Sequence, residues 1–220
     1  KGSRTREFFQ KSQKGYHMAK TRQQSAIDPK FESERLQALL DFKILDTLPE
    51  QQLDDITLLA ARICDTPIAL ISLVDERRQW FKSRIGLDAL ETPREIAFCA
   101  HAINHSEIFI VGDARLDDRF ASNPLVTGEP KVRFYAGAPL ITSDGFSLGT
   151  LCVIDHKPRL LSPEQIKSLE AMARLVITYF ERGKLQQKLV DREVFMNNIV
   201  NNLPDLVSYI DADLKYRYAN

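Results

Sequence analysis

Cysteine is scarce in this sequence, which contains three cysteines, four histidines and one tryptophan among 220 residues. The number of cysteines is odd, and no two of them have the Cys-x-x-Cys spacing. This usage is typical of a reducing compartment with free thiols and argues against a disulfide framework. Long apolar runs are also missing, because no stretch of eighteen apolar residues and no signal-peptide core occurs. We therefore expect no membrane-spanning segment, and the predicted location is the cytoplasm.

The chain carries no net charge, because 30 Lys and Arg balance 30 Asp and Glu. The charges are spread unevenly, since residues 1–24 contain seven basic residues and one acidic residue, Glu7. The rest of the chain is therefore acidic, which argues against nucleic acid as the main partner. The basic segment lacks periodicity and runs into Met18, which fits a native start. We predict that residues 1–30 are a tag or a disordered segment, with a basic binding arm as the alternative.

Helical spacing occurs twice before residue 66, in a chain whose apolar content of 44% is enough for a full core. The first helix is expected to begin near Phe31, and Pro49 fits the first position of the second. The residues expected to face the core are Leu36, Leu39, Leu40 and Ile44 in the first helix, and Leu53, Ile56, Leu59, Ala60 and Ile63 in the second.

Short β-branched and aromatic segments predict five strands, at residues 67–75, 80–86, 108–112, 132–142 and 146–155. The last two are joined across Ser143-Asp144-Gly145, a strong hairpin signal. The segment Ile96–Asn104 is predicted to be a short helix. Residues 113–130 are rich in Asp, Asn, Gly and Pro and predict a long loop, which in a compact domain is often a lid or a binding loop.

A long helical pattern follows the last strand. Ser162 and Gln165 fit a capping box, and apolar residues then continue at helical spacing to Ile199. This predicts about forty residues of helix with one weak point at Gly183, far more than covering a sheet requires. We therefore predict a coiled-coil-like connector and a homodimer through residues 163–201. Together, these elements predict an α+β fold.

The stretch REIAFCAHAINHS contains Cys99, His101 and His105. Residues two apart on a helix point in different directions, so Cys99 and His101 are not expected to pair as nucleophile and base. Cys99 is expected to face the same way as Ile96, and it could be a core or pocket thiol, a ligand contact, or a reactive or attachment thiol. The two histidines have the spacing of metal ligands, but no third ligand follows from spacing, so no metal is predicted.

Aromatic and polar residues near the strand ends are the remaining functional candidates, because the GxGxxG, GxxxxGK[ST], HExxH and GxSxG motifs are all absent. A few polar groups among aromatic side chains are typical of a small-ligand pocket, although an ordinary core has the same composition. No catalytic residue is predicted. The ligand-pocket candidates are Trp80, Phe98, Cys99, His101, Asp113, Phe134, Tyr135 and Cys152.

Four segments resemble, in the expected order, the amino-terminal GAF domains of bacterial sensor proteins, over about Glu32 to Phe180. They are ERLQALLDFKILDTLPEQQLDDITLLAARICDTPIALISLVDERRQWFKS, ETPREIAFCAHAI, NPLVTGEPKVRFYAGAPLIT and SLGTLCVID. The last segment, LPDLVSYIDADLKYRYAN, resembles the opening of a PAS domain. This order is similar to the input half of sensor histidine kinases and of diguanylate cyclases or phosphodiesterases.

The resemblance implies a six-stranded antiparallel sheet with helices on one side and a ligand pocket on the other, roofed by the loop and the short helix. A sixth strand would then lie around Thr92 or within residues 123–131. Cys99 and His101 would lie on the roof helix. Phe134 and Tyr135 would lie on a pocket-side strand.

The resemblance also implies a domain order and a function. The GAF domain would span residues 31–181, a helical connector residues 182–202, and a truncated PAS start residues 203–220. The chain would bind an unidentified small molecule and relay the signal to a histidine kinase or cyclic di-GMP enzyme beyond residue 220. It would itself be no enzyme, and no metal, flavin or bilin is expected.

Three alternatives stay open. Bilin-binding GAF domains attach their chromophore to a cysteine that commonly precedes a histidine directly, whereas Ala100 intervenes here. Free methionine sulfoxide reductases are GAF-fold enzymes with clustered cysteines, and such an activity would use Cys99, although Cys64 and Cys152 do not match that branch. The third alternative is a ligand-free dimerisation and relay module.

Overall fold

The computed structural model describes residues 28–201, 208–210 and 216–219. The contacts within the chain divide it into two compact units, and the boundary along the sequence lies between Phe180 and Glu181. The predicted tag segment lies outside the described residues except for residues 28–30. There the structure differs from the prediction, because helix α2 (Pro29–Asp41) begins two residues before Phe31. Asp28 caps this helix by accepting a 3.0 Å hydrogen bond from the backbone N–H of Lys30.

A six-stranded antiparallel sheet forms the centre of the first unit, in the order β3-β2-β1-β6-β5-β4. The strands are β1 (Ile68–Val74), β2 (Arg78–Ile85), β3 (Glu91–Pro93), β4 (Phe109–Val111), β5 (Phe134–Ile141) and β6 (Ser147–Asp155). The sixth strand is β3, around Thr92, while Pro124–Thr127 in the other predicted place is the short helix α5. Together with the long helix α6 (Pro163–Asn201), this confirms the predicted α+β fold.

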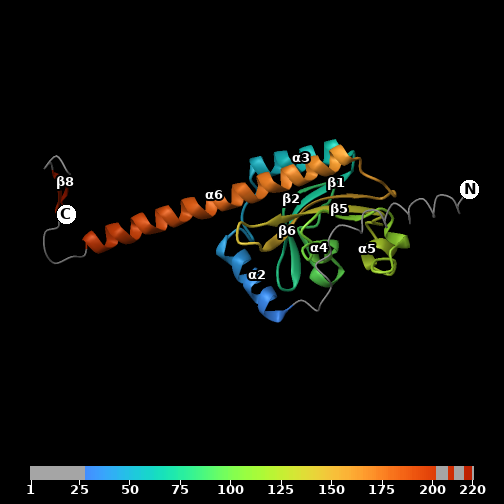
Figure 1. The fold of residues 1–220 in the computed structure, drawn as a ribbon, viewed down its shortest axis with the longest axis horizontal. Coiled ribbons are helices and arrows are strands. Elements are labelled where there is room, and N and C mark those ends of the chain that lie inside the picture. Colours follow the sequence, from blue (N-terminus) through green and yellow to red (C-terminus); the bar gives the residue numbers. More distant parts are fainter. Residues whose placement is uncertain (1–27, 202–207, 211–215, 220) are drawn as a thin grey trace, which may run out of the picture. The chain divides into compact units, whose positions relative to one another are not determined.

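Helices cover both faces of the sheet. Figure 1 shows helix α3 (Gln51–Cys64) and the first part of α6 side by side on one face, and α4 (Phe98–Ala102) and α5 on the other. The helix-side core lies between the sheet and helices α2, α3 and α6. It includes Leu39, Leu53, Ala60, Cys64, Ile71, Trp80, Phe134, Leu151, Leu169, Val176 and Phe180.

The buried face of α3 differs from the predicted one. Leu53 and Ala60 are buried as predicted, but Leu59 is 51% exposed and Ile63 is 41% exposed. Thr57, Ala61 and Cys64 complete the buried face instead. These small side chains let the helix lie close to the sheet. The buried Thr57 hydroxyl has a hydrogen-bond partner, because it donates to the Leu53 carbonyl oxygen at 2.9 Å. In α2, Leu39 is buried as predicted, but Leu40 is 55% exposed.

The predicted capping box and hairpin turn are confirmed, but Pro49 is not the first residue of α3, because the helix begins at Gln51 after Glu50 as its N-cap. Ser162 donates its N–H to Oε1 of Gln165 at 2.9 Å, and Gln165 donates its N–H to Oγ of Ser162 at 3.2 Å, which is the predicted capping box. Gly145 has a φ of +88° in the hairpin between β5 and β6. Gly183 is not a break, because α6 continues through it without interruption.

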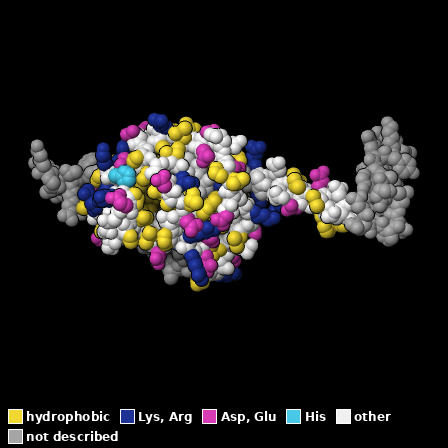
Figure 2. Space-filling view, turned by 180° about the vertical axis from the view of Figure 1, so that it is seen from behind, with side chains coloured by type: hydrophobic (Ala, Val, Ile, Leu, Met, Phe, Trp, Pro, Cys, Tyr) yellow, Lys and Arg dark blue, Asp and Glu magenta, His cyan; other side chains and the backbone are white. Residues whose placement is uncertain are grey.

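The second unit contains the remainder of α6 and two short paired strands, β7 (Ser208–Ile210) and β8 (Tyr216–Ala219). Apolar side chains of this part of α6 are exposed, as Figure 2 also shows. They are Leu185, Leu189, Val190, Val194, Phe195, Met196 and Ile199. Within the described part of the chain, no helix combines the length and the apolar content that a bilayer crossing requires.

Candidate functional site

Helix α4 covers the second face of the sheet and is shorter than predicted. Arg94–Ile96 forms a separate 3-10 turn, η1, and Ala97 is extended with φ −79° and ψ 126°, so the helix begins at Phe98. The sequence predicted that Ile96 and Cys99 share a helix face, and this prediction is wrong, because Ile96 lies outside α4. The roof-side core lies under this helix and includes Phe98, Cys99, Phe109, Phe120, Tyr135 and Cys152.

Stacked aromatic rings fill the roof-side core. The rings of Phe98 and Phe120 stack with centroids 4.1 Å apart, and Phe98 also stacks on Tyr135 at 5.3 Å. The edge of His101 meets Phe120 at 4.8 Å. These distances are in the range in which aromatic pairs attract one another beyond their simple burial. A ligand on this side would therefore have to displace Phe120 or insert among the rings.

The side chain of Cys99 is the centre of a buried polar cluster. Its Sγ accepts hydrogen bonds from the hydroxyl of Tyr135 at 3.2 Å and from that of Thr150 at 3.1 Å. The Sγ of Cys152 lies 3.8 Å away, within hydrogen-bond distance of the Cys99 sulfur. The Ser72 hydroxyl completes the cluster at 3.1 Å from Oγ1 of Thr150. Strands β1, β5 and β6 thus all contribute polar groups to one sulfur atom.

This arrangement separates the pKa values of the two thiols. Burial alone would raise the pKa of Cys99, but hydrogen bonds from the neighbouring thiol and hydroxyls outweigh it and lower that pKa to about 7. For Cys152, burial and then the hydrogen bond to Cys99 raise the pKa well above its usual value. Of the two thiols, Cys99 is therefore the one that loses its proton first.

The structure does not bring all eight predicted candidates together. Phe98, Cys99, Tyr135 and Cys152 meet in the roof-side core, and half-buried His101 lies at its edge. Burial, followed by the charge of Arg119, lowers the pKa of His101.

Trp80 and Phe134 lie in the helix-side core. Phe134 and Tyr135 are successive strand residues and point to opposite faces, so only Tyr135 is on the roof side. Asp113 is buried, and its carboxylate accepts hydrogen bonds from Arg115 at 3.0 and 2.7 Å. It also caps η2 (Ala114–Leu116) through the Arg115 backbone N–H, so its oxygens already have protein partners.

Several residues of the site carry no signal in the sequence. Phe120 belongs to the loop that was expected as a lid, and no spacing pattern distinguishes it. Arg119 places its guanidinium carbon 4.8 Å from the ring centroid of Phe109 and 5.4 Å from that of Phe120. Asn123 ties this loop to the roof by donating from Nδ2 to the Ile96 carbonyl oxygen at 2.9 Å.

The two histidines once considered as metal ligands contact different rings, since His105 stacks on Phe109 at 5.0 Å whereas His101 meets Phe120. Across the described residues, no three His, Cys, Asp or Glu side chains are grouped so as to hold a metal ion.

A buried ion-pair network holds α2 to the segment before the roof. Arg35 is 1% exposed, and its Nη2 lies 2.8 Å from Oε1 of Glu32. Arg94 reaches the same oxygen at 2.6 Å and also donates to the Asp75 carbonyl oxygen at 3.0 Å. Burial alone would raise the pKa of Glu32, but the hydrogen bonds from both guanidinium groups lower it to about 2.

We expect Glu32→Gln to lower the free energy of unfolding by about 1–2 kcal/mol at pH 7, a value reduced for solvent screening because the Glu32 side chain is 20% exposed. A depressed pKa adds stability above the unfolded value of about 4.5 and loses it as the pH falls towards 2. In urea unfolding, the difference in the free energy of unfolding between the wild type and Glu32→Gln should therefore be smaller at pH 3 than at pH 7. Glu34→Gln is the control, because Glu34 only faces exposed Lys30 at 4.0 Å. Equal effects of the two variants would contradict this assignment.

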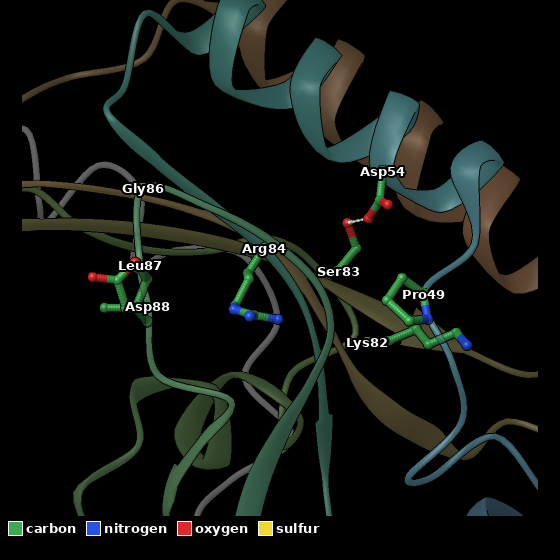
Figure 3. A pocket seen from close by; sticks show the side chains of 8 residues that line it. All are labelled: Pro49, Asp54, Lys82, Ser83, Arg84, Gly86, Leu87 and Asp88. Atoms are coloured by element: carbon green, nitrogen blue, oxygen red, sulfur yellow. Dashed lines mark hydrogen bonds between the residues drawn. The ribbon is translucent and has the colours of Figure 1, made fainter.

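A separate cavity of about 390 Å³ lies beside β2 and the start of α3 (Figure 3). In Figure 3 the side chains of Asp54 and Ser83 point toward one another, and their oxygens are 2.6 Å apart. The buried ammonium of Lys82 contacts Glu50 at 2.7 Å, so this charge is already paired. The cavity is lined by Pro49, Asp54, Lys82, Ser83, Arg84, Gly86, Leu87 and Asp88. None of the predicted candidates lines it.

A curated relative shares much of the sequence. Over 135 residues the chain is 50% identical to a cyclic di-GMP phosphodiesterase of Pseudomonas aeruginosa. The match covers 61% of this chain but only 23% of the relative, so the chain spans less than a quarter of that protein's length.

Solved structures share the fold at low sequence identity. The GAF domain of the Acinetobacter phosphoenolpyruvate-protein phosphotransferase has a TM-score of 0.52 and 18% identity, covering 69% of this chain and 93% of that one. The free methionine-R-sulfoxide reductase of Neisseria meningitidis has a TM-score of 0.51 and 17% identity, covering 72% and 88%. At such identities the likeness concerns the fold alone.

The family itself is identified by the sequence of the first unit. The GAF-domain family model matches residues 48–178, which include the whole sheet and the roof helix. The chain belongs to the GAF-domain family.

Proposed function

We propose that this chain is the cytoplasmic sensory region of a multidomain bacterial signalling protein whose output is cyclic di-GMP hydrolysis. The observation that carries the proposal is the 50% identity over 135 residues to a cyclic di-GMP phosphodiesterase. Because the match covers 23% of that relative, the hydrolytic residues would lie outside the matched region. The chain itself would regulate the hydrolysis and would not catalyse it. The proposed PAS start at residues 203–220 would belong to the next domain of the same protein.

The proposed input is a small molecule that binds in the roof-side core. Helix α4 and the loop of Phe120 cover this core, and both are short segments without long-range sheet pairing. A flat molecule that takes the place of the Phe120 ring would keep the stacking on Phe98, whose centroid is 4.1 Å from that of Phe120. Entry of this molecule would move the loop that Asn123 ties to the roof.

The proposed relay runs from the sheet into α6. Strand β6 carries roof-side Cys152 and ends at Asp155, only seven residues before the Ser162 cap of α6. Arg159 bonds Asp155 and also lies 3.2 Å from Asp65 at the end of α3. A ligand that favours one roof packing would then shift the equilibrium between two positions of α6. The free energy of this shift is at most the difference in the ligand's binding free energy between the two packings.

We propose a homodimer through α6 as the element that passes this shift on. Leu185, Leu189, Met196 and Ile199 repeat at spacings of four, seven and three residues and are all exposed. With Arg192 at the position between Leu189 and Met196, these residues follow the alternating four- and three-residue spacing that is typical of the seam of a two-stranded coiled coil. Pairing two such seams would remove the apolar side chains from water.

Native mass spectrometry of the purified chain tests the sensory proposal. We expect a dimer and a non-covalent small-molecule adduct that is lost on denaturation. Phe120→Ala should change the adduct occupancy severalfold, whereas Asp88→Asn, at an exposed residue of the separate cavity, should not. A bare dimer with no adduct after incubation with cell extract would favour the ligand-free relay module instead. A covalent adduct on Cys99 would point to an attached chromophore.

A reductase is the second candidate, favoured by the 3.8 Å approach of Cys99 and Cys152. Free methionine sulfoxide would be its substrate. The test is consumption of methionine sulfoxide in the presence of dithiothreitol, for which the sensory proposal expects no turnover.

A further inference from the structure

We propose that Cys99 and Cys152 form a reversible disulfide when the chain meets a hydroperoxide, and that this bond locks helix α4 to strand β6. Such a redox input would operate independently of the small ligand and of the output domain proposed above. Its basis is the geometry of the thiol cluster in the roof-side core.

The two sulfur atoms are already neighbours. They lie 3.8 Å apart although 53 residues separate them in the sequence. A disulfide requires about 2.0 Å, so the sulfurs must approach by less than about 2 Å. Helix α4 has five residues and no side-chain cap, and small rotations of a helix this short can supply the movement. Strand β6, in contrast, is paired on both sides by β1 and β5 and is the fixed partner.

The surroundings assign different roles to the two thiols. The hydroxyls of Tyr135 and Thr150 donate to Cys99, which stabilises its thiolate. The pKa of Cys99 is lowered to about 7, while that of Cys152 is raised by burial and by its neighbour. Cys99 is thus the attacking sulfur and Cys152 the resolving one.

The reaction has two steps that balance with hydrogen peroxide as the oxidant. The Cys99 thiolate attacks one peroxide oxygen, the O–O bond breaks, and a sulfenic acid forms while hydroxide leaves and takes up a proton. The Cys152 sulfur then attacks the Cys99 sulfur, and the S–O bond breaks as the S–S bond forms. The leaving hydroxide takes the Cys152 proton. In total, two thiols lose two hydrogens and one peroxide becomes two waters.

Cys64 is an internal control for this chemistry. It is buried in the helix-side core, on the opposite face of the sheet, and burial raises its pKa to about 11. No other cysteine lies in that core among the described residues. Cys64 therefore has neither a stabilised thiolate nor a resolving thiol.

Both thiols of the pair are at most 1% exposed, so the oxidant reaches them only when the roof opens. A small uncharged peroxide fits this route better than a bulky or charged oxidant. Once formed, the bond would hold Cys99, and with it the neighbouring ring of Phe98, against the sheet. Oxidation would thus select one packing of the roof.

The test treats the native chain with hydrogen peroxide, denatures it, alkylates the remaining thiols and maps the peptides by mass spectrometry. We expect a peptide pair linked through Cys99 and Cys152, with two of the three thiols lost and both regained with dithiothreitol. Cys64 should still react with the alkylating reagent. Its thiol should be lost to peroxide at least about tenfold more slowly than those of Cys99 and Cys152. This experiment uses the unmodified protein and so does not depend on any variant's folding.

Variants then separate the roles. Cys152→Ala should leave Cys99 as a sulfenic acid that dimedone traps, Cys99→Ala should protect Cys152, and Cys64→Ala should form the disulfide at the original rate. Equal oxidation rates for all three thiols in the native chain would overturn the proposal. So would a disulfide that involves Cys64, or over-oxidation of Cys99 without a link to Cys152.

Discussion

Gly149→Ala should destabilise this domain more than a Gly→Ala substitution at any other described glycine outside turns. Gly149 is the third of the nine residues of β6 and lies opposite Leu73 of β1. A Cβ built at this position would be 1.9 Å from the Ser72 carbonyl oxygen and 2.8 Å from the Leu73 Cα. Both are backbone atoms of a central strand, so neither can turn away. We expect Gly149→Ala to lower the free energy of unfolding by about 3 kcal/mol or more.

The control for this prediction is Gly183→Ala. A Cβ at Gly183 meets nothing within 4 Å, and the residue lies inside helix α6. Alanine there should stabilise the helix by about 0.5–1 kcal/mol. Urea unfolding of the two variants should therefore give opposite signs. The steric account fails if Gly149→Ala unfolds at the same urea concentration as the wild type.

Removing two apolar side chains from the second part of α6 should convert a dimer into a monomer. Leu189 is 59% exposed and Met196 is 50% exposed, and they are seven residues apart. In a two-fold symmetric dimer, Leu189→Asn together with Met196→Asn removes four apolar side chains from one seam. At about 1 kcal/mol or more for each, the dissociation constant should rise at least about 700-fold.

Analytical ultracentrifugation over a concentration series measures this change. The matched control is Gln187→Asn with Asp191→Asn, which alters two exposed polar residues of the same helix that do not flank the seam. We expect the control to remain a dimer. A wild-type chain that stays monomeric at high concentration, or a double variant with unchanged association, would contradict the connector assignment.

The parts of the fold that depend on neighbouring residues were predictable from the sequence. The Ser162 capping box and the turn at Gly145 each involve residues within a few positions of one another, so their signals are local. The other five strands carry enough apolar residues to be recognised one by one, including β4, which also has only three residues. Strand β3 has three residues, including Thr92 and Pro93, and its pairing with β2 gives it its conformation. Only the resemblance to a family indicated that a sixth strand existed.

The candidate site was less predictable, because it depends on which side chains from distant segments pack together on each face of the sheet. The sequence suggested Leu59 and Ile63 for the buried face of α3, but close packing selected the smaller Ala61 and Thr57. Cys99 and Cys152 were both named as candidates, yet no spacing rule joins a short helix to a strand 53 residues later. Phe120 was missed for the same reason, since a loop residue has no periodicity that reveals its side.

Cyclic di-GMP turnover by the full-length protein and by residues 1–220 alone would show whether this chain regulates the hydrolysis without catalysing it. We predict hydrolysis by the full-length protein, none by residues 1–220, and a rate in the full-length protein that changes severalfold with Phe120→Ala. Asp88→Asn, at an exposed residue of the separate cavity, should leave the rate unchanged. Hydrolysis by residues 1–220, or a full-length rate indifferent to the roof-side core, would contradict the account.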